Sequence, residues 1–346
     1  MSPHILIALA LTMGTGTTTA LMSSHWLLAW VGLEMSTLAI LPIMSHKSHP
    51  RATEATTKYF LIQAAAASLI LFSGMTNAWL TGFWDIQQML HPLPTTILTA
   101  GLALKIGLAP LHFWMPDVLQ GLSLTAGLIL CTWQKIAPVG ILLQLQPFSS
   151  TTLLLGLVSS LVGGWGGLNQ TQLRKLLAYS SIAHLGWMVT VSQLSPPLAL
   201  LSFLLYMIMT TAAFSTLMLN NTTGISALTI MWAKSPLAAA ATPTIFLSLG
   251  GLPPLTGFLP KWLILQELTK QDMNIAATLM ALSALLSLFF YLRISYVAVL
   301  TMTPNNLPGT TPWRLPQPKM TSPTATCIAL SVMLLPTAPL MLTALS

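Results

Sequence analysis

The chain consists of long apolar stretches that are separated by shorter polar connections. A helix needs about 20 apolar residues to cross the hydrocarbon core of a bilayer, and most of the stretches have that length. Their apolar residues occupy every face, whereas barrel strands alternate polar and apolar residues in runs of about ten. The pattern predicts an all-α integral membrane protein with about eleven transmembrane helices. The predicted spans are roughly 4–22, 24–44, 57–80, 95–116, 122–145, 151–168, 176–194, 197–219, 236–269, 275–300 and 323–345.

Longer polar connections lie at 45–56, 81–94, 220–235 and 301–322. The last of them is rich in proline, which lacks the amide donor that a helix interior needs, so no helix is expected there. No connection is long enough to form a separate soluble domain. We therefore expect a single transmembrane domain over residues 1–346.

Composition excludes most other classes of protein. Hydrophobic residues make up 54% of the chain and charged residues 5%, whereas a soluble domain carries about a quarter charged residues. The formal net charge is +7, but the basic residues are scattered singly at the ends of spans and form no stripe that could follow a nucleic acid. Cys131 and Cys327 are too few to hold an iron–sulfur cluster. Phosphate-binding glycine motifs and H-E-x-x-H are missing from the sequence, so we expect no cofactor, metal or nucleotide in this chain.

The basic residues of the loops also predict an orientation. With eleven spans the two termini lie on opposite sides, and the loops on the far side from the N-terminus contain Lys270 alone. Loops on the cytoplasm-equivalent side collect Lys and Arg, so the N-terminus is predicted to face that side. The basic loop residues on the N-terminal side are Lys47, Arg51, Arg174, Lys175, Lys234, Arg314 and Lys319.

Two spans contain copies of one motif. Residues 107–116 are GLAPLHFWMP and residues 251–260 are GLPPLTGFLP, with five of ten positions identical. The copies lie in the fourth and the ninth span, so they run through the membrane in opposite directions. Helices interrupted by Gly and Pro at matching positions of two inverted halves indicate a transport site. The residues expected to break the two helices are Gly107, Pro110, Gly251, Pro253 and Pro254.

Four ionisable residues lie inside predicted spans: Glu34, Lys105, Lys135 and Lys261. A charge at the centre of a membrane helix costs about 2.5–3.5 kcal/mol, so residues that remain there are candidates for function. Buried lysines near a carboxylate can take up and release protons, which predicts a proton relay. Two alternatives stay open: Glu34 as a structural partner of a lysine, and Lys261 as a side chain that reaches the interface.

Other ionisable residues have a simpler interpretation. Arg293, Asp117 and Glu267 lie nearer the ends of spans, where an interfacial position is expected. His112 and His184 lie within spans, and hydrogen-bonded packing is the role we expect for them.

Several segments resemble the antiporter-like membrane subunits of respiratory complex I. They are LKIGLAPLHFWMPDVLQG around Lys105, GGLPPLTGFLPKW around Lys261, SSHWLLAWVGLEM around Glu34, TWQKIAP around Lys135 and GGWGGLNQTQLRKLLAYSSIAHLGW around Arg174. The resemblance implies two inverted five-helix repeats, 4–145 and 151–300, followed by the loop 301–322 and an extra C-terminal helix at 323–345. It also implies that Glu34 pairs electrostatically with Lys105, that Lys135 is the central lysine of the relay, and that Lys261 lies near its exit.

The chain differs from this pattern in its symmetry. Lys261 aligns with Asp117, and Lys105 aligns with Leu249, so the two halves are not chemically equivalent.

The resemblance implies proton translocation across the mitochondrial inner membrane, with the N-terminus in the matrix. The expected partners are the lipid bilayer and other membrane subunits of complex I, with no nucleic acid; NADH, flavin, iron–sulfur clusters and ubiquinone are expected in other subunits. Two other functions stay open: a free-standing cation/proton antiporter, and an assembly scaffold.

Overall fold

A computed structural model of the chain describes residues 2–46, 49–89, 91–145, 150–300, 322–338, 340 and 343. Most of these residues are helical, and a short 3₁₀ turn follows the last helix at Leu335–Thr337. The helices are α1 (Pro3–Met22), α2 (Trp26–Met44), α3 (Pro50–Thr81), α4 (Pro92–Ile106), α5 (Trp114–Gly121), α6 (Leu124–Cys131), α7 (Trp133–Gln144), α8 (Ser150–Gly167), α9 (Leu173–Val191), α10 (Pro196–Leu219), α11 (Ile225–Leu228), α12 (Met231–Lys234), α13 (Pro236–Gly250), α14 (Phe258–Lys270), α15 (Asn274–Leu300) and α16 (Ser322–Met333).

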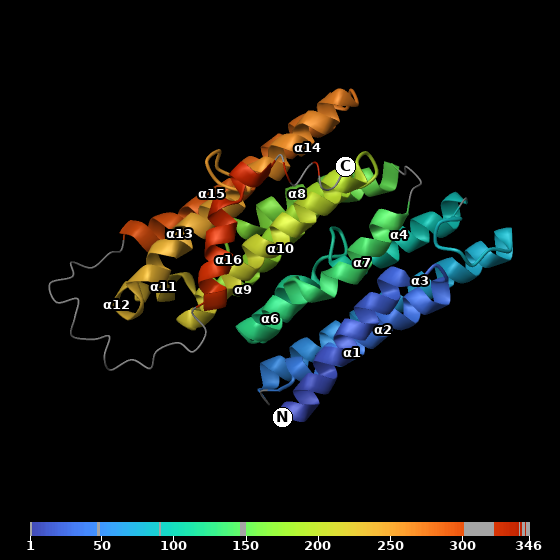
Figure 1. Cartoon of the computed structure of the whole chain (residues 1–346), viewed down its shortest axis with the longest axis horizontal. Helices are drawn as coiled ribbons and strands as arrows, with labels where there is room; N and C mark the ends of the chain where they lie inside the picture. The colour runs from blue at the N-terminus through green and yellow to red at the C-terminus, as the bar shows by residue number, and fades with distance from the viewer. Residues whose placement is uncertain are drawn as a thin grey trace.

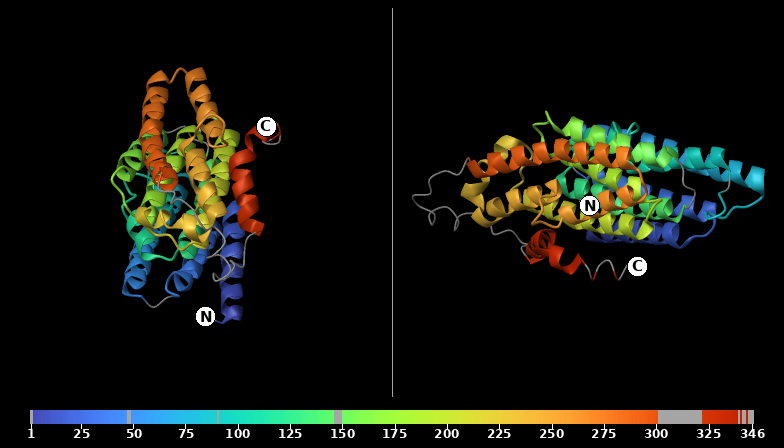
Figure 2. Two further views of the ribbon diagram at one scale, coloured as in Figure 1. Left: turned by 90° about the vertical axis from the view of Figure 1, so that its left-hand side faces the viewer. Right: turned by 90° about the horizontal axis from the view of Figure 1, so that it is seen from above.

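The long helices lie side by side in one elongated bundle (Figure 1). Helices α1 to α3 form one side of it, α13 to α15 form the opposite side, and α4 to α10 lie between them. The most extensive pairings are α8 with α9, α1 with α2, α3 with α4, and α13 with α15. Helix α16 packs on α10 and α13 and lies on the outside of the bundle in both views of Figure 2. The middle of the bundle is therefore the part of the chain that is covered by protein on all sides.

Six helices of the described residues are long and apolar enough to cross a membrane. They are Pro3–Met22, Trp26–Met44, Pro50–Thr81, Leu124–Gln144, Pro196–Asn220 and Asn274–Leu300. Large apolar side chains such as Leu61, Leu285 and Phe289 are more than half exposed on the outer faces, as expected for contact with lipid. The all-helical membrane class predicted from the sequence is confirmed.

Helix α3 begins earlier than predicted, at Pro50 instead of about residue 57. His49 caps this end, because its Nδ1 accepts a hydrogen bond from the amide of Arg51 at 3.2 Å. Proline suits the first helical turn, where its missing amide is not needed. The prediction failed because the first turns carry Arg51, Glu54 and Lys58, which hydropathy excludes from a span although they are helical.

The predicted span 122–145 is divided by a distortion at Thr132, which separates α6 from α7. The Thr132 hydroxyl donates to the carbonyl of Leu128 at 2.7 Å, and the amide of Lys135 bonds to the carbonyl of Thr132 at 3.2 Å. Pro138 cannot donate to the carbonyl one turn earlier, so the regular ladder is weakened on both sides of Lys135. The sequence interpretation missed this irregularity.

The predicted C-terminal helix over 323–345 is interrupted in the structure, and the described residues 338, 340 and 343 are helical again after the interruption. Helix α16 ends at Met333, and the chain then forms the 3₁₀ turn around Pro336. Proline disfavours the helical conformation of the residue before it and removes a donor, which accounts for the early end. The proline-rich loop predicted at 301–322 lies outside the described residues except for Ser322.

Candidate functional site: a row of buried polar groups

The chain leaves the helical conformation at both copies of the repeated motif. Helix α4 ends at Ile106 and α5 begins at Trp114; helix α13 ends at Gly250 and α14 begins at Phe258. Pro110 lies in the first non-helical segment, 107–113, and Pro253 and Pro254 lie in the second, 251–257. Both interruptions therefore coincide with the prolines of the motif.

A left-handed glycine ends the first half of each broken helix. Gly107 has a φ of 85° and Gly251 a φ of 81°, a conformation that side chains other than glycine rarely adopt. The amides of Gly107 and Leu108 both bond to the carbonyl of Ala103 at 2.8 Å. The amides of Gly251 and Leu252 bond in the same way to the carbonyl of Leu247, at 3.1 and 3.4 Å. The internal repeat thus extends from sequence to individual backbone hydrogen bonds.

In each broken helix, a side chain of the second half donates a hydrogen bond to a backbone carbonyl of the first half. The indole Nε1 of Trp114 donates to the carbonyl of Leu104 at 3.1 Å. The Nζ of Lys261 donates to the carbonyl of Gly250 at 2.7 Å. The amide of Leu108 bonds to Ala103 instead of Leu104. The residue four positions after Gly250 is Pro254, which has no amide. These side chains therefore donate to carbonyls that lack their usual helical partner.

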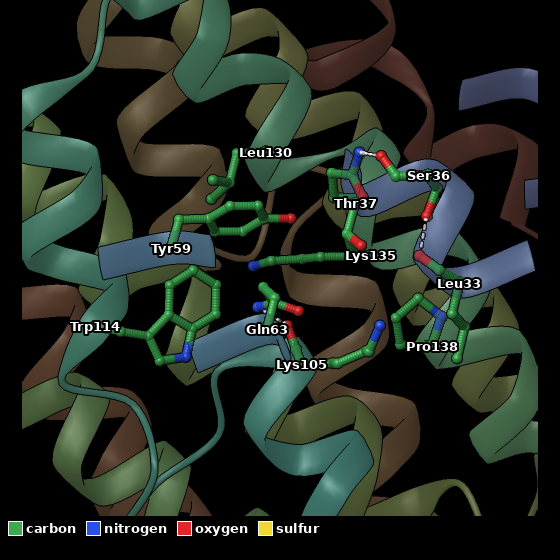
Figure 3. Close-up of a pocket in the computed structure, with 11 residues that line it drawn as sticks. Leu33, Ser36, Thr37, Tyr59, Gln63, Lys105, Trp114, Leu130, Lys135 and Pro138 are labelled. Carbon is green, nitrogen blue, oxygen red and sulfur yellow. Dashed lines mark hydrogen bonds between the residues drawn. The ribbon is translucent and has the colours of Figure 1, made fainter. Parts of the chain in front are cut away.

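Lys105 and Lys135 line one small cavity between α2, α3, α4 and α7 (Figure 3). The cavity measures about 10 Å³, close to the space that one water molecule needs. Polar side chains of its wall include Ser36, Thr37 and Gln63, and the Nε2 of Gln63 donates to the carbonyl of Lys105 at 3.4 Å.

The two lysines of this cavity differ in their contacts. Lys105 is 6% exposed, and its buried Nζ has no hydrogen-bond partner among the described residues. Lys135 is 2% exposed and donates to the hydroxyl of Tyr206 at 3.1 Å. Only Lys135 is therefore held in place by a direct hydrogen bond at its ammonium group.

Glu34 lies near this cavity without lining it. Its carboxylate accepts a hydrogen bond from the Thr37 hydroxyl at 3.1 Å. Within the described ranges, ion pairs closer than 4 Å join Lys58 to Glu54, Lys58 to Asp117, and Lys270 to Glu267; Glu34 and Lys105 are not among them. Glu34 is nevertheless close enough to Lys105 for an electrostatic interaction.

Aromatic and imidazole groups continue the row beyond Lys135. Tyr206 accepts from Lys135 and donates to the carbonyl of Cys131 at 3.0 Å. The ring of His184 lies 5.9 Å from the ring of Tyr206, and its Nε2 is 3.4 Å from the hydroxyl of Tyr291. His184 also lies within electrostatic range of both Lys135 and Lys261. The row therefore leads from the first interruption towards the second.

The sequence interpretation missed Tyr206 and Tyr291. Both are almost fully buried, and their hydroxyl groups lie within apolar spans where hydropathy gives no reason to single them out. A buried tyrosine hydroxyl needs a hydrogen-bond partner, which could have marked them as candidates.

The ionisable residues near span ends have local partners. The guanidinium of Arg293 donates to the carbonyls of Leu168, at 2.7 Å, and Gln170. Asp117 lies 3.9 Å from Lys58 at the other edge of the first broken helix, and Glu267 lies 3.6 Å from Lys270. None of the three lies in the row that joins the lysines.

Neutral and charged nitrogen and oxygen groups in such a row can exchange protons over short distances. Lysine, histidine and tyrosine each both donate and accept in one of their protonation states. No group of three His, Cys, Asp or Glu side chains in the described part of the chain is placed to hold a metal ion. The arrangement suits the movement of protons inside a membrane, the use to which intramembrane ionisable groups are commonly put.

The sequence and the fold both match one class of membrane subunits. Residues 23–287 match the family described as "NADH:quinone oxidoreductase/Mrp antiporter, TM", and residues 288–342 match "NADH dehydrogenase subunit 2 C-terminus". The chain is 62% identical to NADH-ubiquinone oxidoreductase chain 2 of Tetraodon nigroviridis over 99% of both chains. It is 59% identical to the protein of the same name from Salmo salar over 100% of both.

Solved structures share the fold over nearly the whole chain. A chain of respiratory complex I from Thermus thermophilus superposes with a TM-score of 0.88 at 29% identity, covering 99% of this chain and 80% of that one. A chain of the Mrp complex from Dietzia sp. gives 0.82 at 16% identity, covering 97% and 76%, which is a likeness of fold alone. The chain belongs to the NADH-ubiquinone oxidoreductase chain 2 family and is thus a membrane subunit of respiratory complex I.

Proposed function

We propose that this subunit moves protons through the bilayer along the row Lys105, Lys135, Tyr206, His184 and Tyr291, with Lys261 at its far end. The observation that carries the proposal is that these buried groups follow one another through the middle of the bundle, with hydrogen bonds from Lys135 to Tyr206 and between His184 and Tyr291. A row of buried polar groups without such a role would be costly in a membrane.

Glu34 and Lys105 form the input of the proposed relay. Because the carboxylate is not in contact with the ammonium group, a change of charge at Glu34 acts on Lys105 through the electric field. The cavity that Lys105 and Lys135 line has the volume of about one water molecule, and in the proposal a water molecule there carries protons between the two lysines.

His184 and the two tyrosines supply the connection that three lysines alone would lack. Lys135 contacts Tyr206 directly, and His184 lies between Tyr206 and Tyr291. His184 therefore has a place in proton transfer in addition to the packing role expected from the sequence.

The proposed topology has eleven crossings when α4 with α5, α6 with α7, and α13 with α14 each count as one. Residues 4–145 and 151–300 then form two inverted repeats, and α16 is the additional C-terminal crossing. The proposed matrix side is the end of the bundle where the N-terminus, Arg51, Arg174 and Lys175 lie, in agreement with the rule for basic loop residues. Lys47, Arg314 and Lys319 lie outside the described residues.

In this proposal the chain works in the mitochondrial inner membrane, together with the other membrane subunits of complex I. The redox groups, which are NADH, flavin, iron–sulfur clusters and ubiquinone, belong to other subunits. The present chain would respond to their chemistry through changes of charge.

The test replaces Lys135, which lies at the centre of the row. In purified complex reconstituted into vesicles, we expect Lys135→Ala to assemble normally and to lower proton pumping severely, because it removes a group that exchanges protons. Lys135→Arg should also impair pumping, since arginine keeps its proton. Lys270→Ala is the matched control, because the side chain of Lys270 is 60% exposed and its ion pair within the described residues is with Glu267, at a helix end.

Assembly, NADH oxidation and vesicle acidification are measured on the same preparations. If pumping and electron transfer are tightly coupled, the two rates fall together; if they are loosely coupled, only protons per electron fall. Full assembly with unchanged oxidation and an unchanged ratio for Lys135→Ala would remove Lys135 from the relay and favour the scaffold function.

A further inference from the structure

A second cavity, separate from the row of lysines, lies at the end of the bundle that contains the N-terminus. It measures about 540 Å³ and is formed by the start of α1, the end of α2, the start of α3, the end of α5, and the starts of α6 and α9. Its polar wall includes the basic side chains of His46, His49, Arg51 and Arg174. The cavity therefore lies between helix ends of the first half and the start of α9.

The charge of this cavity is not balanced from within. No Asp or Glu is among its lining residues, and the nearby carboxylates of Glu54 and Asp117 lie 2.8 and 3.9 Å from Lys58. In the described part of the chain, neither Arg51 nor Arg174 has a carboxylate within 4 Å. Arg51 also borders an adjoining cavity that contains Glu54 and Asp117, but no carboxylate lines the space that Arg51 shares with Arg174.

Arg174 is held in position rather than extended into solvent. Its Nη1 donates to the carbonyl of Leu122, while its buried Nε has no hydrogen-bond partner among the described residues. A guanidinium fixed in this way presents its donors without the entropy cost of ordering a free side chain. The N-terminus of α3 adds a favourable dipole for an anion at the same place.

The remaining wall is apolar. Leu6, Ile43 and Met44 line the cavity next to the basic residues, and Ile5 and Ile7 of α1 are more than half exposed beside it. An inorganic anion makes no favourable contact with apolar side chains. An amphiphile instead places its charged group on the arginines and its hydrocarbon chains along α1. The volume also exceeds what a single phosphate ion would fill.

From this geometry we infer that the cavity binds the phosphate-bearing headgroup of an anionic phospholipid. Arg51 and Arg174 bind the phosphodiester oxygens, for which the planar guanidinium is well suited. Basic pockets between transmembrane helices at this side of a membrane are typical sites for anionic headgroups. The lipid would join α1, which is otherwise little covered by protein, to the rest of the first half.

The experiment uses the assembled complex and two photoreactive lipids with identical chains, phosphatidylglycerol and phosphatidylcholine. After irradiation, labelled peptides are identified by mass spectrometry. We expect phosphatidylglycerol to label residues near 43–46, 49–52 and 120–125 more strongly than phosphatidylcholine, because the choline ammonium is repelled by the arginines. Arg51→Gln should lower this labelling about tenfold, the effect of losing a hydrogen bond to a charged group.

The control variant is Lys175→Gln, which removes a positive charge beside Arg174 at a residue that does not line the cavity. It should leave labelling unchanged, and Arg51→Lys should retain part of it. Arg51 is preferred over Arg174 as the test position because it is exposed, so its substitution should not disturb assembly.

Three results would overturn the inference. Equal labelling in Arg51→Gln and the unaltered complex would show that the arginine binds no headgroup. Displacement of phosphatidylglycerol by millimolar inorganic phosphate would identify a site for free anions. Cross-links from the cavity to an acidic segment of another subunit, with no lipid adduct, would identify a protein contact.

Discussion

At residues 107–113 and at residues 251–257 the chain leaves one helix and begins another after a left-handed glycine, yet different side chains complete the two interruptions. In the first, the neutral indole of Trp114 donates to the carbonyl of Leu104. In the second, the ammonium group of Lys261 donates to the carbonyl of Gly250. The two interruptions therefore share a backbone conformation, but the side chain that donates the hydrogen bond is neutral in one and charged in the other.

In the first half of the chain, different side chains stabilise the interruption and exchange protons in the proposed relay. In the second half, Lys261 does both. Because Trp114 supplies the structural hydrogen bond, the amine of Lys105 has no bond to make with the backbone and lies beside the small cavity. Lys261 has to satisfy a carbonyl and, in the proposed relay, also to exchange protons. Substitutions in the second interruption should therefore disturb structure and transport together, whereas substitutions in the first should separate them.

The two interruptions also differ in how closely their last residue packs against the backbone of the preceding helix. Gly257 packs directly on the carbonyl of Ser248, and a Cβ atom at this position would overlap it. The corresponding residue of the first interruption is Phe113, whose side chain is 73% exposed. One position therefore excludes every side chain, and its counterpart accepts a large one.

We expect the largest effect from Gly257→Ala. The new methyl group must push the second interruption away from α13, and overpacking of this kind costs about 1–3 kcal/mol or more, because the contact is with backbone that cannot rotate away. The amount of the chain in assembled complex, measured on native gels, should fall strongly. Phe113→Ala is the matched control and should assemble normally; equal assembly of the two variants would contradict the difference in backbone approach.

The next largest effect is a difference in thermal stability between the variants Lys105→Met and Lys261→Met. Both remove an amine from the proposed relay, so both should lower proton pumping. Only Lys261→Met also leaves a carbonyl without its donor, which costs about 1–3 kcal/mol when the group is buried. We expect a lower thermal unfolding temperature of the complex for Lys261→Met and a nearly unchanged one for Lys105→Met. Similar losses of stability in both variants would show that Lys105 has a structural role that its contacts do not reveal.

Much of this comparison could be predicted from the sequence, because the features concerned are local. Gly107 and Gly251 occupy matching positions of a motif, and the prolines that follow them cannot continue a helix, so the places of both interruptions follow from residue chemistry. Lys105 and Lys261 stood out for the same reason: a charge in an apolar span is visible without knowledge of the fold.

What could not be predicted depends on contacts between distant segments. Tyr206 joins the row only because α10 brings its hydroxyl to Lys135, 71 residues earlier in the chain. The distortion at Thr132 arises from a hydroxyl that competes for a backbone carbonyl, which a hydropathy profile does not register. Glu34 and Lys105 lie within electrostatic range of each other but do not form an ion pair within 4 Å, and no pattern within either helix determines that distance.

The smallest expected effect tests the neutral donor of the first interruption. Trp114→Phe keeps most of the ring and removes only the indole N–H, so the carbonyl of Leu104 loses its partner at 3.1 Å. Removing one neutral hydrogen bond costs about 1 kcal/mol. The added backbone motion should stay local, because the amide of Gly107 still bonds to the carbonyl of Ala103. We expect faster amide hydrogen exchange in residues 105–115, with assembly preserved. Trp165→Phe serves as control, since this indole is 75% exposed on α8. If exchange in residues 105–115 rises equally in both variants, or in neither, Trp114 does not stabilise the interruption, and the separation of structural and transport tasks in the first half has to be abandoned.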